Sequence, residues 1–239
     1  MSLKITRNYS ISFNSKKRSK KNIKFVIFHY TGMKTEKAAI NKLINIQSQV
    51  ATHYLVKKNG DIVNMVPDLY VAWHAGVSSW NGENSLNKSS VGIEIINPGH
   101  QFGYEKFSNK QINSLITLCK ILKKKYTIKK NNFLGHSDIA PDRKKDPGEK
   151  FPWEYLAKKN IGYWHKLDRK NLKKLRNKNC NKLLRKNFFN NIFKIGYSKV
   201  NNKNNYLNYL IKAFQRRYRP ELVNGKIDQE CLLISQNLI

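Results

Sequence analysis

Segments with the two-residue period of β-strands alternate with segments of helical period through about the first two thirds of the chain. Residues 25–28 are a continuous apolar run, which is typical of a strand buried on both faces. Residues 91–96 alternate as a strand does, and residues 35–49 and 108–126 carry apolar side chains at helical spacing. This interleaving predicts an α/β domain around a mixed central β-sheet flanked by helices.

Two local signals refine this prediction. The pair Asn59-Gly60 separates two strand-like segments, residues 53–58 and 61–66, and suits a type I′ hairpin turn. In the later strand, the two-residue period places Glu94 on the face opposite a row of valine and isoleucine side chains.

The composition changes at residue 167, where a stretch of mostly Lys, Arg, Asn and Leu extends to residue 182. Two amphipathic helical patterns follow, with Gly196 placed to end the first, and Asp228 can cap a last short helix. We therefore predict an α/β domain at residues 1–166, then a basic linker and a small all-α module at residues 167–239.

The chain is strongly basic, with 46 Lys and Arg against 15 Asp and Glu and a formal net charge of +31. Such an excess favours a polyanionic partner, such as nucleic acid, acidic lipid or anionic cell wall. However, Lys outnumbers Arg, Asn and Ile are frequent, and the charge is spread over the whole chain, as an AT-rich genome would impose. Because no zinc-finger, recognition-helix or aromatic stacking motif accompanies the charge, we expect no nucleic-acid partner.

Cysteine usage and hydropathy exclude several classes of protein. Cys119, Cys180 and Cys231 form no CxxC pair, which argues against a disulfide framework and a thiolate metal cage. No stretch reaches the roughly 18 apolar residues of a membrane span. The first residues show no apolar signal-peptide region, so we expect a cytoplasmic protein; a truncated start would leave the periplasm or cell envelope open.

Two of the six histidines, His29 and His136, each end an apolar strand-like run. Asp146 follows ten residues after His136, in a loop whose prolines and glycine can fold it back toward the imidazole. A catalytic zinc site needs three nitrogen or oxygen ligands and an open position. Spacing alone leaves open that both histidines have purely structural partners.

The other histidines give weaker signals. His53 lies within the first hairpin strand and is expected to be a packed, hydrogen-bonded core residue. His74 follows Trp73 in a loop, where the two rings either line a sugar-binding groove or simply pack. Trp73, His74 and Asn97 are the candidate substrate-binding residues.

Several stretches together resemble the type 2 N-acetylmuramoyl-L-alanine amidases, a family that includes the peptidoglycan recognition proteins. The matching stretches are FVIFHYTG (25–32), ATHYLV (51–56), AWHAGVSSW (72–80), VGIEI (91–95) and GHSDIAPDRKKDPG (135–148). The resemblance to AmiD-type members extends further, through FPWEYLAKKNIGYW (151–164) and FQRRYRPELVNGKID (214–228). The last of these is similar to a helical peptidoglycan-binding module.

The resemblance implies a fold, a reaction and a set of roles. The metal ligands fall on His29, His136 and Asp146, which implies one Zn²⁺ per chain, and the catalytic residues fall on Glu94 and Lys144. The implied reaction is hydrolysis of the amide bond between the muramic acid lactyl group and L-alanine in peptidoglycan or muropeptides. We expect a monomer.

Some members of this family lack a metal ligand and only bind peptidoglycan, so a non-catalytic recognition protein is the alternative. All three ligand positions and Glu94 are present here, which favours an enzyme.

Overall fold

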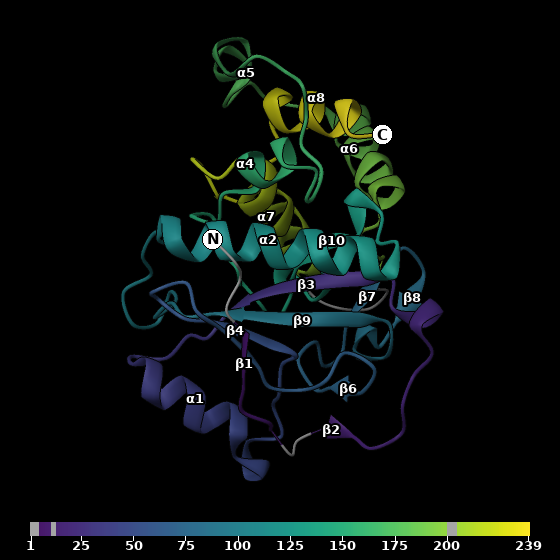
Figure 1. Cartoon of the computed structure of the whole chain (residues 1–239). Coiled ribbons are helices and arrows are strands. Elements are labelled where there is room, and N and C mark those ends of the chain that lie inside the picture. The colour runs from purple at the N-terminus through teal and green to yellow at the C-terminus, as the bar shows by residue number, and fades with distance from the viewer. Residues whose placement is uncertain (1–4, 11–12, 200–204) are drawn as a thin grey trace.

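The computed structural model describes residues 5–10, 13–199 and 205–239, and within them a mixed sheet carries the fold (Figure 1). Its strands, in spatial order, are β1 (Ile5–Arg7), β5 (Ile62–Asn64), β4 (Tyr54–Val56), β9 (Ser90–Ile95), β3 (Phe25–Tyr30) and β10 (Phe133–Gly135). β4 and β5 are antiparallel, whereas the other neighbouring strands run parallel. The predicted mixed α/β sheet is confirmed.

Further elements surround the sheet. The α-helices are α1 (Glu36–Ile44), α2 (Asn109–Tyr126), α3 (His136–Ile139), α4 (Trp153–Lys158), α5 (Arg169–Leu175), α6 (Lys182–Ile195), α7 (Tyr206–Tyr218) and α8 (Gln229–Asn237). Short 3₁₀ helices are η1 (Lys20–Asn22), η2 (Ile46–Ser48), η3 (Leu86–Lys88) and η4 (Lys130–Asn132). Two small ribbons pair β2 (Phe13–Asn14) with β6 (Val71–Ala72), and β7 (Ser79–Trp80) with β8 (Glu83–Asn84). Among the described residues, no helix is long and apolar enough to cross a bilayer.

Helices α1 and α2 cover opposite faces of the sheet (Figure 1). The capping box of Ser108 and Gln111 opens α2, as its sequence predicts, and its apolar side packs with Val91, Ile93 and Ile95 of β9 in one core cluster. Since Cβ atoms alternate along a strand, the other face of β9 carries Glu94. The core therefore directs this carboxylate away from α2.

The hairpin between β4 and β5 differs from the type I′ prediction. Gly60 has a φ of +90°, whereas Asn59 is not among the residues with positive φ, and a type I′ turn needs both. The backbone N–H of Gly60 donates to the Lys57 carbonyl, and that of Lys57 donates to the Asp61 carbonyl. The connection is thus a three-residue loop with its glycine at the bulge position.

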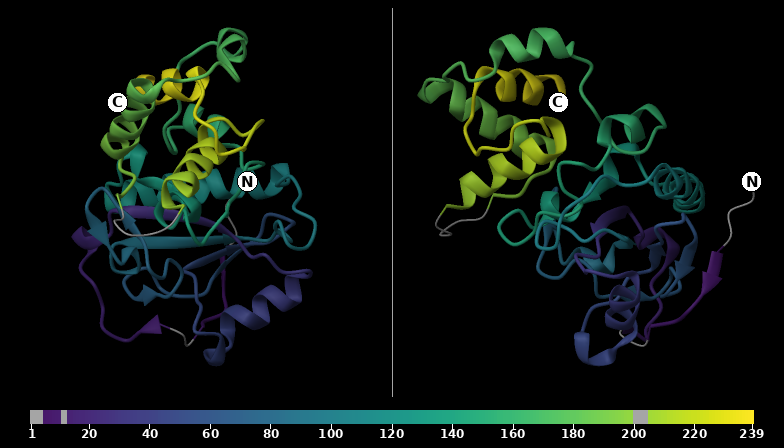
Figure 2. Two further views of the ribbon diagram at one scale, coloured as in Figure 1. Left: turned by 180° about the vertical axis from the view of Figure 1, so that it is seen from behind. Right: turned by 90° about the vertical axis from the view of Figure 1, so that its left-hand side faces the viewer.

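The C-terminal helices pack beside the sheet domain, as the green and yellow elements of Figure 2 show. The stretch predicted to be a linker contains a helix, α5, whose N-cap Asp168 accepts a hydrogen bond from the Asn171 N–H. Gly196 ends α6 and Asp228 caps α8, both as predicted.

One hydrophobic cluster joins the two parts of the chain. It contains Phe25 and Ile27 of β3 and Leu134 of β10, together with buried side chains of α6, α7 and α8 such as Phe188 and Phe214. The helices after residue 166 therefore bury part of the sheet. The predicted domain boundary at residue 166 stays a prediction.

Candidate active site

Two neighbouring strands bring the first pair of site residues together. β3 and β9 are parallel, and their register sets His29 opposite Glu94. His29 is the penultimate residue of β3, at the carboxyl edge of the sheet, where sites in open α/β sheets are commonly built. Strand pairing therefore fixes the relative position of an imidazole and a carboxylate.

The other two candidate ligands come from the segment after β10. His136 is the first residue of α3, and the loop that follows folds back so that the Ser137 N–H donates to the Asp146 carbonyl at 2.8 Å. Lys144 lies within the same loop, where its N–H donates to the Ala140 carbonyl. The backbone thus returns Asp146 to the side of His136, as the sequence predicts.

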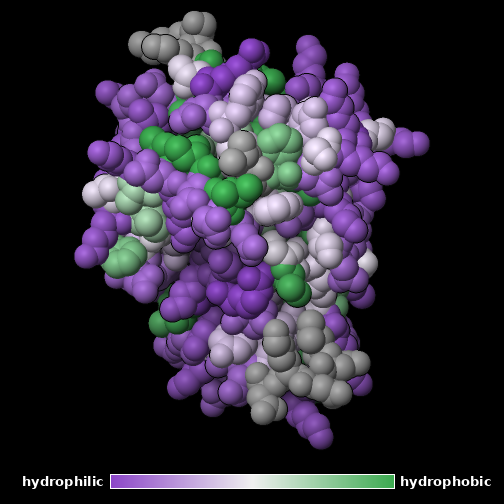
Figure 3. All heavy atoms as spheres, turned by 90° about the horizontal axis from the view of Figure 1, so that it is seen from below, coloured by the Kyte–Doolittle hydropathy of each residue, from purple (hydrophilic) through white to green (hydrophobic). Residues whose placement is uncertain are grey.

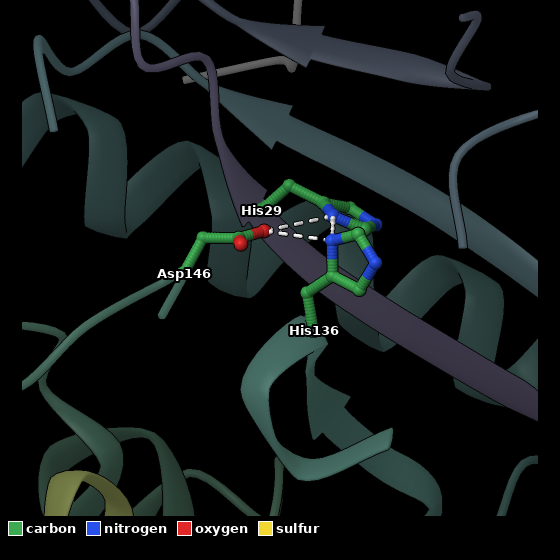
Figure 4. Close-up of side chains that lie close together, drawn as sticks. All are labelled: His29, His136 and Asp146. Carbon is green, nitrogen blue, oxygen red and sulfur yellow. Dashed lines mark hydrogen bonds and ion pairs between the residues drawn. The ribbon is translucent and has the colours of Figure 1, made fainter. Parts of the chain in front are cut away.

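His29, His136 and Asp146 converge on one point (Figure 4). The Nδ1 atoms of His29 and His136 are 2.9 Å apart, and each lies 3.0 Å from Oδ2 of Asp146. All three residues are buried. Two imidazole nitrogens with one carboxylate oxygen are a donor set that zinc accepts at catalytic sites.

Burial and proximity shift the pKa values of two members of this cluster, His29 and Asp146. Burial, then the neighbouring His136, lowers the pKa of His29 to about 4. Burial alone would raise the pKa of Asp146, but His136 and His29 outweigh it and hold that pKa well below its usual range. A neutral imidazole and an ionised carboxylate are the forms that bind a metal ion.

Hydrogen bonds behind the cluster define which nitrogen of His136 is free. Its Nε2 lies 3.1 Å from the carbonyl oxygen of Ala75, which can only accept, so Nε2 carries the proton. With that proton on Nε2, the neutral form of the ring turns the lone pair of Nδ1 toward Asp146 and His29.

The proton position on His29 follows in the same way from the hydrogen bonds of two further side chains, Ser90 and His74. The Ser90 hydroxyl donates its one proton to the Leu86 carbonyl at 2.6 Å, so its oxygen accepts from Nε2 of His74 at 3.2 Å. Nδ1 of His74 is then an acceptor, and it lies 3.1 Å from Nε2 of His29. His29 therefore carries its proton on Nε2 and turns a free Nδ1 toward the cluster.

This arrangement corrects the predicted role of His74. The ring is buried, and both of its nitrogens are occupied within the protein, so it lies behind His29 and does not offer them to a sugar. The alternative of packing within the loop describes it better. The part played by Ser90 had no signal in the sequence, because it depends on how the strand and the loop meet.

Glu94 is buried beside the cluster, and its Oε2 atom has no hydrogen-bond partner. Burial, followed by the negative charge of Asp146, raises the pKa of its carboxyl to about 8. It lines the same pocket as the three candidate ligands, so its carboxyl group borders the space that a reacting group would enter.

The cluster opens into a pocket of about 730 Å³. Lys144 is half-buried in its wall, Lys145 is exposed, and Trp73 is 40% exposed. Trp73 therefore lies where it can contact a ligand, and its role in substrate binding stays a prediction.

Asn97 does not fit its predicted contact with substrate. Its side chain is 1% exposed, with Nδ2 donating to the Glu105 carbonyl and Oδ1 accepting from the Gly99 N–H. The Asn97 side chain therefore stabilises its own loop through these two hydrogen bonds.

His53 is buried and accepts a hydrogen bond from the Gly92 N–H at Nδ1, which confirms it as a core residue.

Comparisons with known proteins agree with this geometry. Residues 19–149 match the family model described as N-acetylmuramoyl-L-alanine amidase. The chain is 35% identical to N-acetylmuramoyl-L-alanine amidase AmiD of Escherichia coli over 230 residues, covering 91% of this chain and 82% of that protein.

Solved structures show the same fold. One is AmiD of E. coli in complex with anhydro-N-acetylmuramic acid-L-Ala-D-γ-Glu-L-Lys, with a TM-score of 0.80 and 33% identity over 94% of this chain and 91% of that one. Another is AmpDh3 of Pseudomonas aeruginosa with an anhydromuramic pentapeptide, with a TM-score of 0.78 and 30% identity over 94% and 95% of the two chains.

The mixed sheet and the cluster at its carboxyl edge thus define a type 2 amidase fold. The chain belongs to the N-acetylmuramoyl-L-alanine amidase family.

Proposed function

We propose that this amidase cleaves the bond between the muramic acid lactyl group and L-alanine of peptidoglycan or muropeptides, with one zinc ion per chain. The observation that carries the proposal is the set of three donor atoms, all within 3.0 Å of one another, at the wall of the large pocket. The substrate class is supported by the muropeptides bound to the related AmiD and AmpDh3.

The residues present fit a catalytic zinc site. His29, His136 and Asp146 provide three nitrogen and oxygen ligands, and the pocket leaves room on the fourth side. When bound, zinc supplies Lewis acidity, which activates water near neutral pH and polarises the scissile carbonyl. The hydrogen bonds of His74 and Ala75 to the outer nitrogens keep both rings in the tautomer that such a site needs.

Glu94 is the general base and then the general acid in this proposal. Its free oxygen and elevated pKa suit it to take a proton from the attacking water, because burial favours the protonated carboxyl. The same carboxyl then delivers that proton to the leaving nitrogen of L-alanine.

Lys144 stabilises the oxyanion that develops on the scissile carbonyl. Its side chain is half-buried in the wall of the pocket, where a positive charge acts more strongly than it would in open water. The combination of ligands, base and cation favours an amidase over a protein that only binds peptidoglycan.

Metal analysis of ligand variants tests this proposal. We expect pure wild-type protein to hold one zinc per chain, and His29→Ala and His136→Ala each to lose it together with activity. His53→Ala is the matched control, since it removes an equally buried histidine; it should keep zinc while losing roughly 1–3 kcal/mol of stability through the unsatisfied Gly92 N–H. Zinc-free active protein, or a folded His53→Ala variant that lost its zinc, would contradict the assignment.

A further inference from the structure

A buried carboxylate two residues after His136 connects the metal site to the C-terminal helices. Asp138 lies in α3, the one-turn helix that His136 opens, and is 1% exposed. Its Oδ2 accepts a hydrogen bond from the Gly135 N–H at 2.7 Å, which joins the end of β10 to α3. A helix of four residues has little stability of its own, so these contacts set its orientation.

The partners of Asp138 come from the far end of the chain. Arg217 of α7 is 2% exposed, and its Nη1 donates to Oδ2 of Asp138 while its Nη2 donates to the Phe133 carbonyl at 3.1 Å. The guanidinium carbon lies 4.2 Å from the ring centre of Trp153. Tyr197, which follows α6, donates its hydroxyl proton to the second oxygen of Asp138 at 2.8 Å.

Arg217 therefore holds both sides of His136: the last strand before it, through Phe133, and the helix it begins, through Asp138. Figure 1 shows α7 lying close to the region of β10, and the contacts between α3 and α7 agree. An arginine with two directed donors fixes the orientation of a segment, and not only its distance from a neighbour.

We propose that the C-terminal helices are part of the catalytic apparatus, with Arg217 and Tyr197 acting as positioning residues that hold His136 through Asp138. This goes beyond the predicted separate binding module. It rests on the proposed metal site, and it assigns the C-terminal segment a role in metal affinity that does not depend on glycan binding.

Arg219 offers a matched control on the adjacent turn of chain. It is 1% exposed, and its Nη1 lies 2.5 Å from Oδ2 of Asp228 and 3.4 Å from Oε2 of Glu230. Within the part of the chain that the structure describes, the side-chain hydrogen bonds of Arg219 go to residues 224–230, away from the metal site. Arg219→Met thus removes an equally buried ion pair whose hydrogen bonds do not contact β10 or α3.

The test compares zinc affinity in full-length variants, measured by competition with a chromophoric chelator at a temperature where circular dichroism shows each variant folded. Arg217→Met should bind zinc roughly 10–100-fold more weakly than wild type, the range found when an outer partner of a metal ligand is lost. Arg219→Met should lower the melting temperature yet leave zinc affinity unchanged, and Arg217→Lys should restore part of the affinity.

Equal zinc affinity in wild type and Arg217→Met, or an equal loss in Arg219→Met, would overturn the inference. If Arg217→Met does not fold, the Tyr197→Phe variant tests the inference, since it removes only one hydroxyl group. Unchanged zinc affinity in Tyr197→Phe would also overturn the inference. Failure of the wild-type protein to bind zinc would instead overturn the proposed function, so the two failures are distinguishable.

Discussion

At the scale of single residues, Glu94 is placed for proton transfer and not for metal binding. It lines the pocket, one of its carboxyl oxygens has no hydrogen-bond partner, and it is not part of the cluster of three candidate ligands. Glu94→Gln should therefore keep zinc and fold while turnover falls roughly 10²–10⁴-fold, the contribution of a general acid–base group.

Steady-state kinetics with a soluble muropeptide, together with metal analysis of the same sample, measure both effects. Loss of zinc from Glu94→Gln would make Glu94 a ligand, and near-normal turnover would remove it from the mechanism.

Lys144 and Lys145 provide a comparison of two neighbouring charges. Both line the pocket, but Lys144 is half-buried and Lys145 is exposed. Lys144→Ala should retain zinc and lose roughly 10²–10³-fold in turnover, as for other groups that stabilise an oxyanion. Lys145→Ala should turn over at nearly the wild-type rate. An equal defect in both variants would mean that only the general positive charge of the loop matters.

The candidate ligands could be predicted from the sequence because their positions follow from strand ends and from the matched motifs. His29 and His136 end strand-like runs, and both prove to lie at the carboxyl edge of the sheet. The partners behind them could not be predicted: Ser90 reaches His29 only through His74, and Arg217 reaches Asp138 from 79 residues away. Such contacts depend on tertiary packing that no local pattern records.

At the scale of elements, Gly92 in β9 has no side chain, and the ring of His74 occupies the space that a side chain would take. A Cβ atom at Gly92 would lie 2.4 Å from Cγ of the His74 ring, and this strand position has no positive φ that would itself require glycine. Gly92→Ala should therefore displace His74. His29 then loses the hydrogen bond that keeps its proton on Nε2, and zinc binding should weaken roughly 10–100-fold.

Chelator competition measures the change in zinc affinity. Gly82→Ala is the control, because nothing lies within 4 Å of its Cβ position and only its φ of +79° is strained. It should cost about 1 kcal/mol of stability and leave zinc affinity unchanged. If both variants bound zinc as wild type does, the proposed part of His74 in holding His29 would be wrong.

Elements whose sequence and environment agree were predicted well. The buried side of α2 contains every apolar position expected from its spacing, and its capping box is present. The stretch at 167–182 was predicted to be a linker because of its charge, yet α5 forms there as its apolar Leu172 is buried in the cluster shared with α7 and α8. A short basic helix of this kind gains its stability from packing, which composition does not reveal.

At the scale of the whole molecule, the charge of +31 has no single focus in the sequence. Hydrophilic side chains cover most of the face shown in Figure 3, and hydrophobic ones occur there in small groups. This agrees with a well-solvated face, while the monomeric state and the cellular location stay predictions. The cluster that joins β3 and β10 to α6, α7 and α8 makes the C-terminal helices a structural support of the site.

Mass spectrometry of the reaction products shows directly which bond the protein cleaves. Zinc-loaded protein is incubated with an anhydromuramyl peptide and, separately, with purified sacculi, beside the folded Glu94→Gln variant. We expect the wild-type protein to form a free peptide with L-alanine at its amino end and a peptide-free muramyl product, and the variant to form them slowly or not at all. Cleavage at another bond, or intact substrate after incubation with folded, zinc-loaded wild-type protein, would contradict it.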